Sequence, residues 1–404
     1  MKKRYLVWVM TAMTLFTGCE KRALPPAAGD QPPVISDSSP GGNAVVVDEV
    51  VPAAEAGNKF DPPILFHLNG LYGYMNKQLQ VVIPPIYNNA THFSDDGYAA
   101  VRCEIGDGSR EGRILDYEGN ILFHENTSYI RLLYDDVICY SSNDDNLYRV
   151  IRFKSNTILA TRLGAAAVST EDGIILVRFF DSSAPGFIHV GYAYVDGLGK
   201  RILPHLKMQR ISRPFREQRA VITDENGDMH IIDLEGKIFG RYVYQRLGDW
   251  FSEGLLPAQT QDGHTGYVNR NGDFAFTIPL ISENEDYYLT PLMATEFRDG
   301  YAFIQTKKIP SAWRIINNQG QYVSDELSLS SAYPFEERLS CINTSEGMYG
   351  YVNTNGEMVI EAVFEKADSF HKGYARIVYQ GRDGLLIPDG QVFWSDEIIT
   401  GSVK

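Results

Sequence analysis

The sequence is poor in cysteine, with four residues among 404. Cys19 lies close to the N-terminus, which leaves Cys103, Cys139 and Cys341 in the rest of the chain, and this odd number does not predict a disulfide framework. Cys103 and Cys139 each end a predicted strand in successive repeats, so a single bridge and two buried thiols both stay open. Neither Cys-x-x-Cys nor His-x-x-x-His spacing occurs, which argues against a zinc site.

Local motifs of common catalytic sites are also missing. The sequence has no nucleophile elbow, no phosphate-binding loop and no dinucleotide fingerprint, because its glycine-rich stretches fall in predicted hairpin turns. We therefore expect no cofactor, no catalytic residue and no enzymatic activity. Basic residues are outnumbered as well: the formal charge is -14, and about -17 without Lys2, Lys3 and Arg4. Such a chain repels phosphate backbones, so no nucleic-acid partner is expected.

The strongest local signal lies in the first eighteen residues. Lys2, Lys3 and Arg4 precede the apolar run Tyr5 to Phe16, and Thr17-Gly18 precedes Cys19. This pattern resembles a bacterial lipoprotein signal peptide over residues 1–18, although Phe16 stands where the usual signal has leucine. The resemblance implies that Cys19 becomes the acylated N-terminus and that the protein is exported and held at a membrane. The alternative, a permanent transmembrane anchor, is disfavoured because the run is short.

Residues 19–61 have the composition of a linker. They are rich in proline, glycine and serine and poor in aromatic residues, so they cannot bury enough apolar surface to fold alone. Val45 to Val51 is the one apolar stretch, and it either docks as a short strand or stays in the linker. Glu20 follows Cys19, where enterobacterial lipoproteins retained in the inner membrane have aspartate. The outer membrane is thus the expected location in a Gram-negative cell.

From about residue 62 onward the chain repeats itself. Residues 73–93 and 350–370 align without a gap and share seven identities in about 21 positions. A third clear copy begins at Gly266-Tyr267-Val268-Asn269. More divergent copies bring the total to about nine starts, spaced by roughly 34 to 48 residues. The remaining starts lie near Arg113, Arg149, Ala193, His230, Arg314 and Gly384.

Each copy predicts a β-hairpin followed by one or two further strands. An apolar stretch ends at Asn or Asp, a turn with Gly follows, and a second apolar stretch resumes. Sustained helical periodicity is nearly absent. A unit of three or four short strands cannot cover its own apolar face, so neighbouring units must stack on one another. The expected fold is all-β, with tandem antiparallel units.

The repeat frame resembles the bacterial WG (Trp-Gly) repeats, in which an aromatic-Gly pair opens a hairpin that ends in Asp or Asn. Here Tyr72 and Tyr349 take the place of the tryptophan, which survives only as Trp313, followed by Arg314. The signature residues are expected to be structural. They are Gly73, Tyr74, Asn76, Gly266, Tyr267, Asn269, Trp313, Gly350, Tyr351 and Asn353.

Two architectures suit such units in residues 62–404. About eight to nine units of this length favour a propeller-like ring, and an open β-solenoid is the alternative. In the ring, the stretch Ile64 to Leu68 is expected to pair with the last hairpin, Gly384 to Trp394, and close the circle. The signature tyrosines are expected to pack between units; stacking on sugars is the alternative.

Acidic loops are the nearest approach to a metal site. Asp107, Asp144 and Asp145 lie in loops with several oxygen ligands, as calcium requires, but without the EF-hand spacing. Solvated turns have the same composition, so calcium is only a weak candidate.

Two functions follow. The first is a non-catalytic binding or scaffold module for a protein or glycan of the cell envelope. The second is a glycan-directed envelope hydrolase with carboxylates at the mouth of a propeller.

Overall fold

The computed structural model describes residues 62–401, except 107, 144–146, 165–167, 170–172, 182–187, 207–212, 225, 279–293 and 309–310. The chain divides into two units, Met1–Pro52 and Ala53–Lys404, and every described residue belongs to the second. The expected signal peptide, Cys19, the linker and the calcium candidates Asp107, Asp144 and Asp145 lie outside the described residues. Within the described ranges, no helix has the length and apolarity needed to cross a membrane.

The described residues form seven antiparallel sheets and one C-terminal helix, α1 (Ser395–Gly401). The first sheet has the order β1 (Ile64–Leu68), β2 (Leu71–Met75) and β3 (Val81–Tyr87). The second has β4 (Asn89–Ala90), β5 (Ala99–Glu104), β6 (Arg110–Leu115) and β7 (Ile121–Asn126). The two sheets before the helix are β24 (Leu329–Ala332), β25 (Leu339–Thr344), β26 (Tyr349–Asn353) and β27 (Met358–Phe364), then β28 (Lys366–Ala367), β29 (Ala375–Tyr379), β30 (Arg382–Leu386) and β31 (Val392–Trp394).

Strands in the middle of the chain continue the same serial order. One sheet contains β8 (Ile130–Tyr134), β9 (Val137–Ser141), β10 (Tyr148–Arg152), β11 (Thr157–Leu163), β12 (Val168–Ser169), β13 (Ile175–Asp181), β14 (Ile188–Val195) and β15 (Arg201–Ile202). The next contains β16 (Ala220–Thr223), β17 (Met229–Ile232), β18 (Ile238–Leu247), β19 (Leu255–Thr260), β20 (Thr265–Asn269) and β21 (Phe274–Thr277). The last is the pair β22 (Tyr301–Lys308) and β23 (Ser311–Asn317).

The hairpin turns expected from the repeat frame are present. The side-chain oxygen of an Asn or Asp accepts hydrogen bonds from the backbone N–H groups two and four residues later, as between Asn353 and Asn355 (2.9 Å) and Glu357 (3.0 Å). This local bond favours the turn over a continued strand. The same pair of bonds occurs at Asn76, Asp116, Asp196, Asp233, Asn269 and Asn317.

Close approach of two strands explains the glycine of the aromatic-Gly pair. A Cβ on Gly350 would lie 2.7 Å from the Cα of Ala362, and a Cβ on Gly266 would lie 2.2 Å from the carbonyl oxygen of Phe276. The strand register shifts beside Gly350, between Tyr349 and Tyr351, so the partner strand bulges toward the glycine. A side chain at these places would force the two strands apart.

Successive units share their cores. One buried cluster joins Leu65 and Tyr74 of the first sheet to Phe93 and Val101 of the next, and comparable clusters join the later units. No unit therefore needs to cover its own apolar face, in agreement with the expected stacking.

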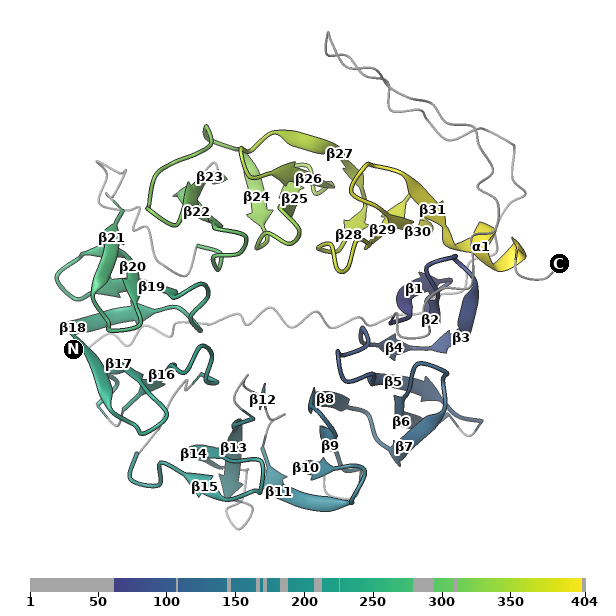
Figure 1. Ribbon diagram of the computed structural model, residues 1–404, viewed down its shortest axis with the longest axis horizontal. Helices are drawn as coiled ribbons and strands as arrows, with labels where there is room; N and C mark the ends of the chain where they lie inside the picture. The colour runs from purple at the N-terminus through teal and green to yellow at the C-terminus, as the bar shows by residue number, and fades with distance from the viewer. Residues whose placement is uncertain are drawn as a thin grey trace, which may run out of the picture. The chain divides into compact units, whose positions relative to one another are not determined.

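The first and last units meet, and the described strands form a propeller-like ring rather than an open solenoid (Figure 1). Phe66 and Met75 pack against Leu385, and His67 Nδ1 lies 2.8 Å from Asp383 Oδ1. The expected pairing of the stretch Ile64 to Leu68 with the last hairpin is wrong. β1 and β30 stand in separate sheets, because β1 pairs with β2 and β30 with β29 and β31. Side-chain packing and the Asp383 contact close the ring instead.

Candidate functional site at the seam of the ring

Four tyrosines link one unit to the next in the same way. The hydroxyl of Tyr351 donates to the carbonyl of Asp368 at 2.7 Å, and its ring lies 4.8 Å from that of Phe370. Burial raises the pKa of the tyrosine, so the hydroxyl stays a donor. The equivalent trios, each with ring centroids 4.8 Å apart, are Tyr74, Thr91 and Phe93; Tyr194, Arg213 and Phe215; and Tyr267, Thr295 and Phe297.

A tight turn follows the phenylalanine in several units; we call these the rim turns. Two consecutive residues in each have positive φ, for example Glu253 (53°) and Gly254 (76°), as in the type I′ turns that join short antiparallel strands. The other such pairs are Glu217 and Gln218, Asp299 and Gly300, Glu337 and Arg338, and Lys372 and Gly373. An acidic residue with positive φ is unusual, and its recurrence indicates a compensating contact.

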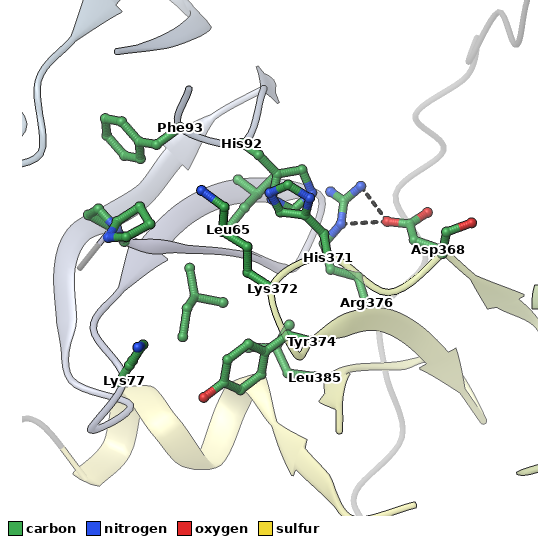
Figure 2. A pocket seen from close by; sticks show the side chains of 14 residues that line it. Leu65, Lys77, His92, Phe93, Asp368, His371, Lys372, Tyr374, Arg376 and Leu385 are labelled. Carbon is green, nitrogen blue, oxygen red and sulfur yellow. Dashed lines mark hydrogen bonds and ion pairs between the residues drawn. The ribbon is translucent and has the colours of Figure 1, made fainter. Parts of the chain in front are cut away.

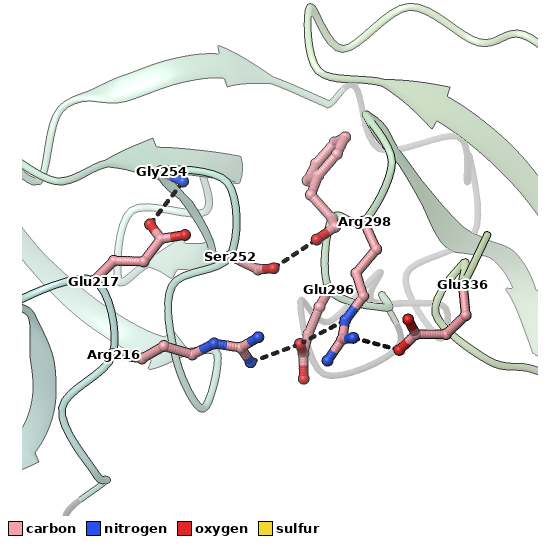
Figure 3. Close-up of polar contacts among 8 residues, drawn as sticks. Arg216, Glu217, Ser252, Gly254, Glu296, Arg298 and Glu336 are labelled. Carbon is pink, nitrogen blue, oxygen red and sulfur yellow. Dashed lines mark hydrogen bonds and ion pairs between the residues drawn. The ribbon is translucent and has the colours of Figure 1, made fainter. Parts of the chain in front are cut away.

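That contact is a hydrogen bond to the next rim turn. The first residue of a turn carries a carboxylate that accepts the backbone N–H of the second residue in the following turn (Figure 3 shows Glu217 and Gly254). The series runs from Glu217 to Gly254 (2.8 Å), Glu253 to Gly300 (3.1 Å), Asp299 to Arg338 (2.7 Å) and Glu337 to Gly373 (2.8 Å). We call it the carboxylate ladder.

Ion pairs reinforce the ladder. Arg216 Nη1 lies 3.0 Å from Glu296 Oε2, and Arg298 bridges Glu296 and Glu336 (Figure 3). Burial raises the pKa of Glu336, whereas the positive charge of Arg298 opposes this shift. The carboxylates of Glu296 and Glu336 are thus paired with arginines.

The carboxylate ladder is interrupted where the chain's last unit meets its first two units. We call this region the seam. Lys372 stands where the other rim turns carry a carboxylate, and its Nζ lies 2.9 Å from Asp95 Oδ1. Beside this pair, the rings of His92 and His371 lie 4.3 Å apart (Figure 2). The turns of the last sheet and of the second sheet therefore contact each other across the first sheet.

A pocket of about 290 Å³ lies at the seam (Figure 2). Its apolar wall includes Pro62, Ile64, Leu65, Phe93 and Leu385. Its polar wall contains three cationic side chains and one carboxylate: Lys77, Lys372, Arg376 and Asp368. Arg376 Nε donates to Asp368 Oδ2 at 2.7 Å. The pocket lining thus combines apolar and cationic side chains, although the whole chain is acidic.

The two seam histidines are held neutral. Desolvation is the largest cause that lowers the pKa of His92, followed by the repulsion that a protonated His371 would exert and by the positive charges of Arg376 and Lys372. Desolvation and Lys372 lower the pKa of His371, while Glu337 and Asp95 act in the opposite direction. Near neutral pH both imidazoles are therefore hydrogen-bonding groups without charge.

The residues singled out from the sequence lie elsewhere. Tyr74, Tyr267 and Tyr351 are buried between units, Asn76, Asn269 and Asn353 hold turns, and Gly73 approaches Ile83 too closely for a side chain. Trp313 is 7% exposed, and its Nε1 donates to the carbonyl of Leu329 at 3.1 Å. None of these residues is among those that line the seam pocket.

Cys103, Cys139 and Cys341 are buried free thiols, so Cys103 and Cys139 do not form a bridge. Burial raises the pKa of Cys341 to about 12 and also raises that of Cys103. Among the described residues, no group of three His, Cys, Asp or Glu side chains is placed to hold a metal ion.

Sequence reasoning missed the seam residues, although two signals were present. Phe-x-Asp/Glu recurs at the rim turns, so Lys372 after Phe370 is a departure. The second signal is the pair Pro62-Pro63 just before β1, since both prolines line the pocket.

Comparison with known proteins supports the fold. A crystal structure of a eukaryotic initiation factor is similar over 83% of this chain and 96% of that one, at 11% identity and a TM-score of 0.55. BamB from Moraxella catarrhalis matches at 12% identity and a TM-score of 0.40, over 74% of this chain and 93% of its own. Apo AztD from Citrobacter koseri matches at 10% identity and a TM-score of 0.39, over 82% of this chain and 92% of its own. At such identities the first likeness shows the fold alone.

Sequence comparison is more limited in extent. No curated protein matches the chain. Two segments, residues 72–104 and 349–382, match the family model described as WG containing repeat. The chain thus carries WG repeats in these two segments, which lie on either side of the seam.

Proposed function

We propose that the protein is an exported lipoprotein that acts as a non-catalytic binding module of the cell envelope, with the seam pocket as its ligand site. The observation that carries this proposal is the pocket itself, whose lining combines apolar side chains with three cationic side chains and one carboxylate. Concave sites with an apolar lining and a few polar groups are the usual form of binding sites. The ligand would be a protein or glycan of the envelope with an anionic group.

Pairing of the carboxylates supports a binding role over hydrolysis. Asp368, the one carboxylate in the pocket lining, is bonded to Arg376. A glycosidase instead needs two carboxyl groups on opposite sides of the substrate. Glu296 and Glu336, which do approach each other, share Arg298.

Capture of a ligand tests the binding role. Ser369 lines the pocket just before Phe370, and Trp250 holds the equivalent place before Phe251, so a Ser369→Trp variant fills the pocket with a side chain that this position accepts elsewhere. Cross-linking in native membranes should recover the same envelope component with the full chain and with the control Pro334→Trp, and much less with Ser369→Trp. Equal recovery with all three proteins would exclude the pocket as the site.

Acylation tests the anchor. The full chain should incorporate a labelled fatty acid and sediment with membranes, whereas Cys19→Ser should do neither, because Cys19 is the proposed attachment site. Labelling of the Cys19→Ser variant would contradict this part of the proposal.

A further inference from the structure

The contact between the chain's last sheet and its first, which we call the closing joint, is built differently from the contacts between other units. β28 to β31 and β1 to β3 form separate sheets, so no strand pairing crosses the joint in the described part of the chain. Leu385 follows Gly384 as Tyr351 follows Gly350, and each glycine lies opposite an isoleucine of the preceding strand. Leucine therefore takes the place of the tyrosine that links other units through its hydroxyl. The carboxylate ladder ends before this joint, because Lys372 stands in the place of the next acid.

The closing joint has a small buried core among the described residues. The two faces of the first sheet can be compared, since Leu65 and Tyr74 pack toward the second sheet and Phe66 and Met75 toward the last. The cluster shared with the second sheet buries side chains from β1, β2, β3, β5 and β6. At the closing joint, the buried members are Phe66, Met75 and Leu385, and the others are partly exposed. Because apolar stabilisation grows with buried area, direct packing of the two sheets holds this joint less firmly.

The C-terminal helix α1 spans the closing joint. It contacts β30 and β31 of the last sheet and β1 of the first, beside which it lies in Figure 1. Ile398 and Ile399 pack against the buried cluster, whose members come from both sheets. The helix therefore adds apolar contacts to both sides of the joint.

A charged contact connects α1 to the last sheet. Arg382 Nη2, at the start of β30, lies 2.9 Å from Asp396 Oδ1 and 2.9 Å from Glu397 Oε1. The guanidinium of Arg382 also lies 4.5 Å from the centre of the Trp394 ring. Because the charged side chains are largely exposed, water screens these pairs. The two isoleucines therefore contribute more to the docking of the helix than the ion pairs do.

The closing joint is also a wall of the seam pocket. Ile64, Tyr374 and Leu385 belong to the cluster on which α1 packs, and all three line the pocket. Ile64 comes from the first sheet and Leu385 from the last, so a separation of β1 from β30 would move two sides of the pocket apart.

We propose that α1 acts as a latch that holds the closing joint shut, and that its release separates β1 from β30 and opens the seam pocket while the other joints stay closed. Proteins open first where few apolar contacts are buried, which is the case at this joint. The inference goes beyond the proposed function, because it concerns the ring itself and its test needs no ligand.

The chain carries its own probes for this opening. Met75 is fully buried in the closing joint, whereas Cys103, Cys139 and Cys341 are buried in other clusters. In the full chain, peroxide oxidation of Met75 reports the closing joint, and maleimide labelling of the three thiols reports the rest of the ring. Both reactions need access to the sulfur atom, and peptide mass spectrometry measures them residue by residue.

Variants of Ile398 test the latch. We expect Ile398→Ala to raise the rate of Met75 oxidation about threefold and Ile398→Asp at least tenfold, with the labelling rates of the three thiols unchanged. The matched control is Ile158→Asp, at an isoleucine of β11 that is 62% exposed, and it should change neither reaction.

A cross-link distinguishes separation of the sheets from simple uncovering of Met75 by the helix. The side chains of His67 and Asp383 meet across the joint, with Nδ1 2.8 Å from Oδ1. His67→Cys and Asp383→Cys, joined by a short thiol-reactive cross-linker, should return Met75 oxidation in the Ile398→Asp chain to the rate of the parent.

Three outcomes would overturn the latch. The first is Met75 oxidation at the parent rate in both Ile398 variants. The second is thiol labelling that rises in parallel with Met75 oxidation in Ile398→Ala, since the ring would then unfold as one body. The third is fast oxidation that persists in the cross-linked chain, because α1 would then only cover Met75. Each of these results leaves the proposed binding role to its own test.

Discussion

The rim turns from Glu217 to Gly373 and the seam near β1 join neighbouring units in different ways. Along the ladder, a carboxylate of one turn accepts the backbone N–H of the next. At the seam, Lys372 meets Asp95, two histidine rings face each other, and a pocket remains beneath them. The ladder satisfies its polar groups within the protein, whereas the seam leaves a pocket between its side chains. The repeated rim-turn contacts are thus structural, and the candidate site lies where the repeat pattern is broken.

The largest expected effect comes from removing a phenylalanine of the Tyr-Phe pairs. Phe297→Ala should destabilise the ring by about 3 to 5 kcal/mol, because it leaves a cavity in a closed interface. Phe93→Ala should cost less, since Phe93 already borders the seam pocket. Urea unfolding of both variants measures the difference. Equal losses would mean that the seam is packed as tightly as the ladder side.

A smaller effect is expected at the hairpin glycines. Gly350→Ala should cost about 1 to 3 kcal/mol, because the new Cβ would meet the backbone of Ala362. Gly73→Ala should cost the same, since Gly73 meets Ile83 and Pro84 in the same way, even though its unit lies at the seam. Thermal unfolding checks this equality, and Gly347→Ala, with no atom within 4 Å of its Cβ but a φ of 82°, controls for backbone strain alone.

Removing one carboxylate of the ladder should have a modest effect. Glu253→Ala removes the acceptor for the N–H of Gly300 and leaves a residue with positive φ, so we expect a loss of about 1 kcal/mol. Lys372→Ala removes an exposed ion pair, for which about 0.5 kcal/mol or less is expected. Chemical denaturation of the two variants compares them. A greater loss of unfolding free energy for Lys372→Ala than for Glu253→Ala would mean that the ion pair of Lys372 stabilises the ring more than a bond of the ladder does.

The last expected effect is a pH dependence of stability at the seam. The pKa values of His92 and His371 are lowered in the folded protein, while unfolded histidine titrates near 6.5, so the unfolded chain binds more protons in acid. Their contribution to stability is fully present above pH 6.5 and falls as the pH drops toward the folded pKa values. The melting temperature of His92→Asn and His371→Asn should therefore decrease less between pH 7.5 and 5 than that of the parent. His205→Asn serves as the control, and an unchanged slope in the seam variants would refute the prediction.

The fold was predictable from local chemistry. The frame around Gly350, with its turn at Asn353 and Gly356, predicted stacked antiparallel units, and the number and length of these units favoured a propeller-like ring over an open solenoid. The mode of closure was not predictable, because the contact between His67 and Asp383 joins residues 316 positions apart and depends on the curvature accumulated over all units.

The site could not be predicted by the same reasoning. His92, Lys77 and Arg376 occupy different positions of the repeat frame, and Arg376 meets the other two only because the first and last units are neighbours. The useful signal is a departure from the repeat, because Lys372 stands where the other rim turns have an acidic residue.

The tyrosine hydroxyl bonds leave the connection between units free to vary in length. The donor and acceptor are separated by 17 residues at Tyr74 and Tyr351, 19 at Tyr194 and 28 at Tyr267, yet each tyrosine keeps the same 4.8 Å contact with its phenylalanine. New sequence can therefore enter between the two without disturbing the docking of adjacent blades. Evolution, or an engineer grafting loops, can use these connections to diversify the surface while the scaffold stays constant.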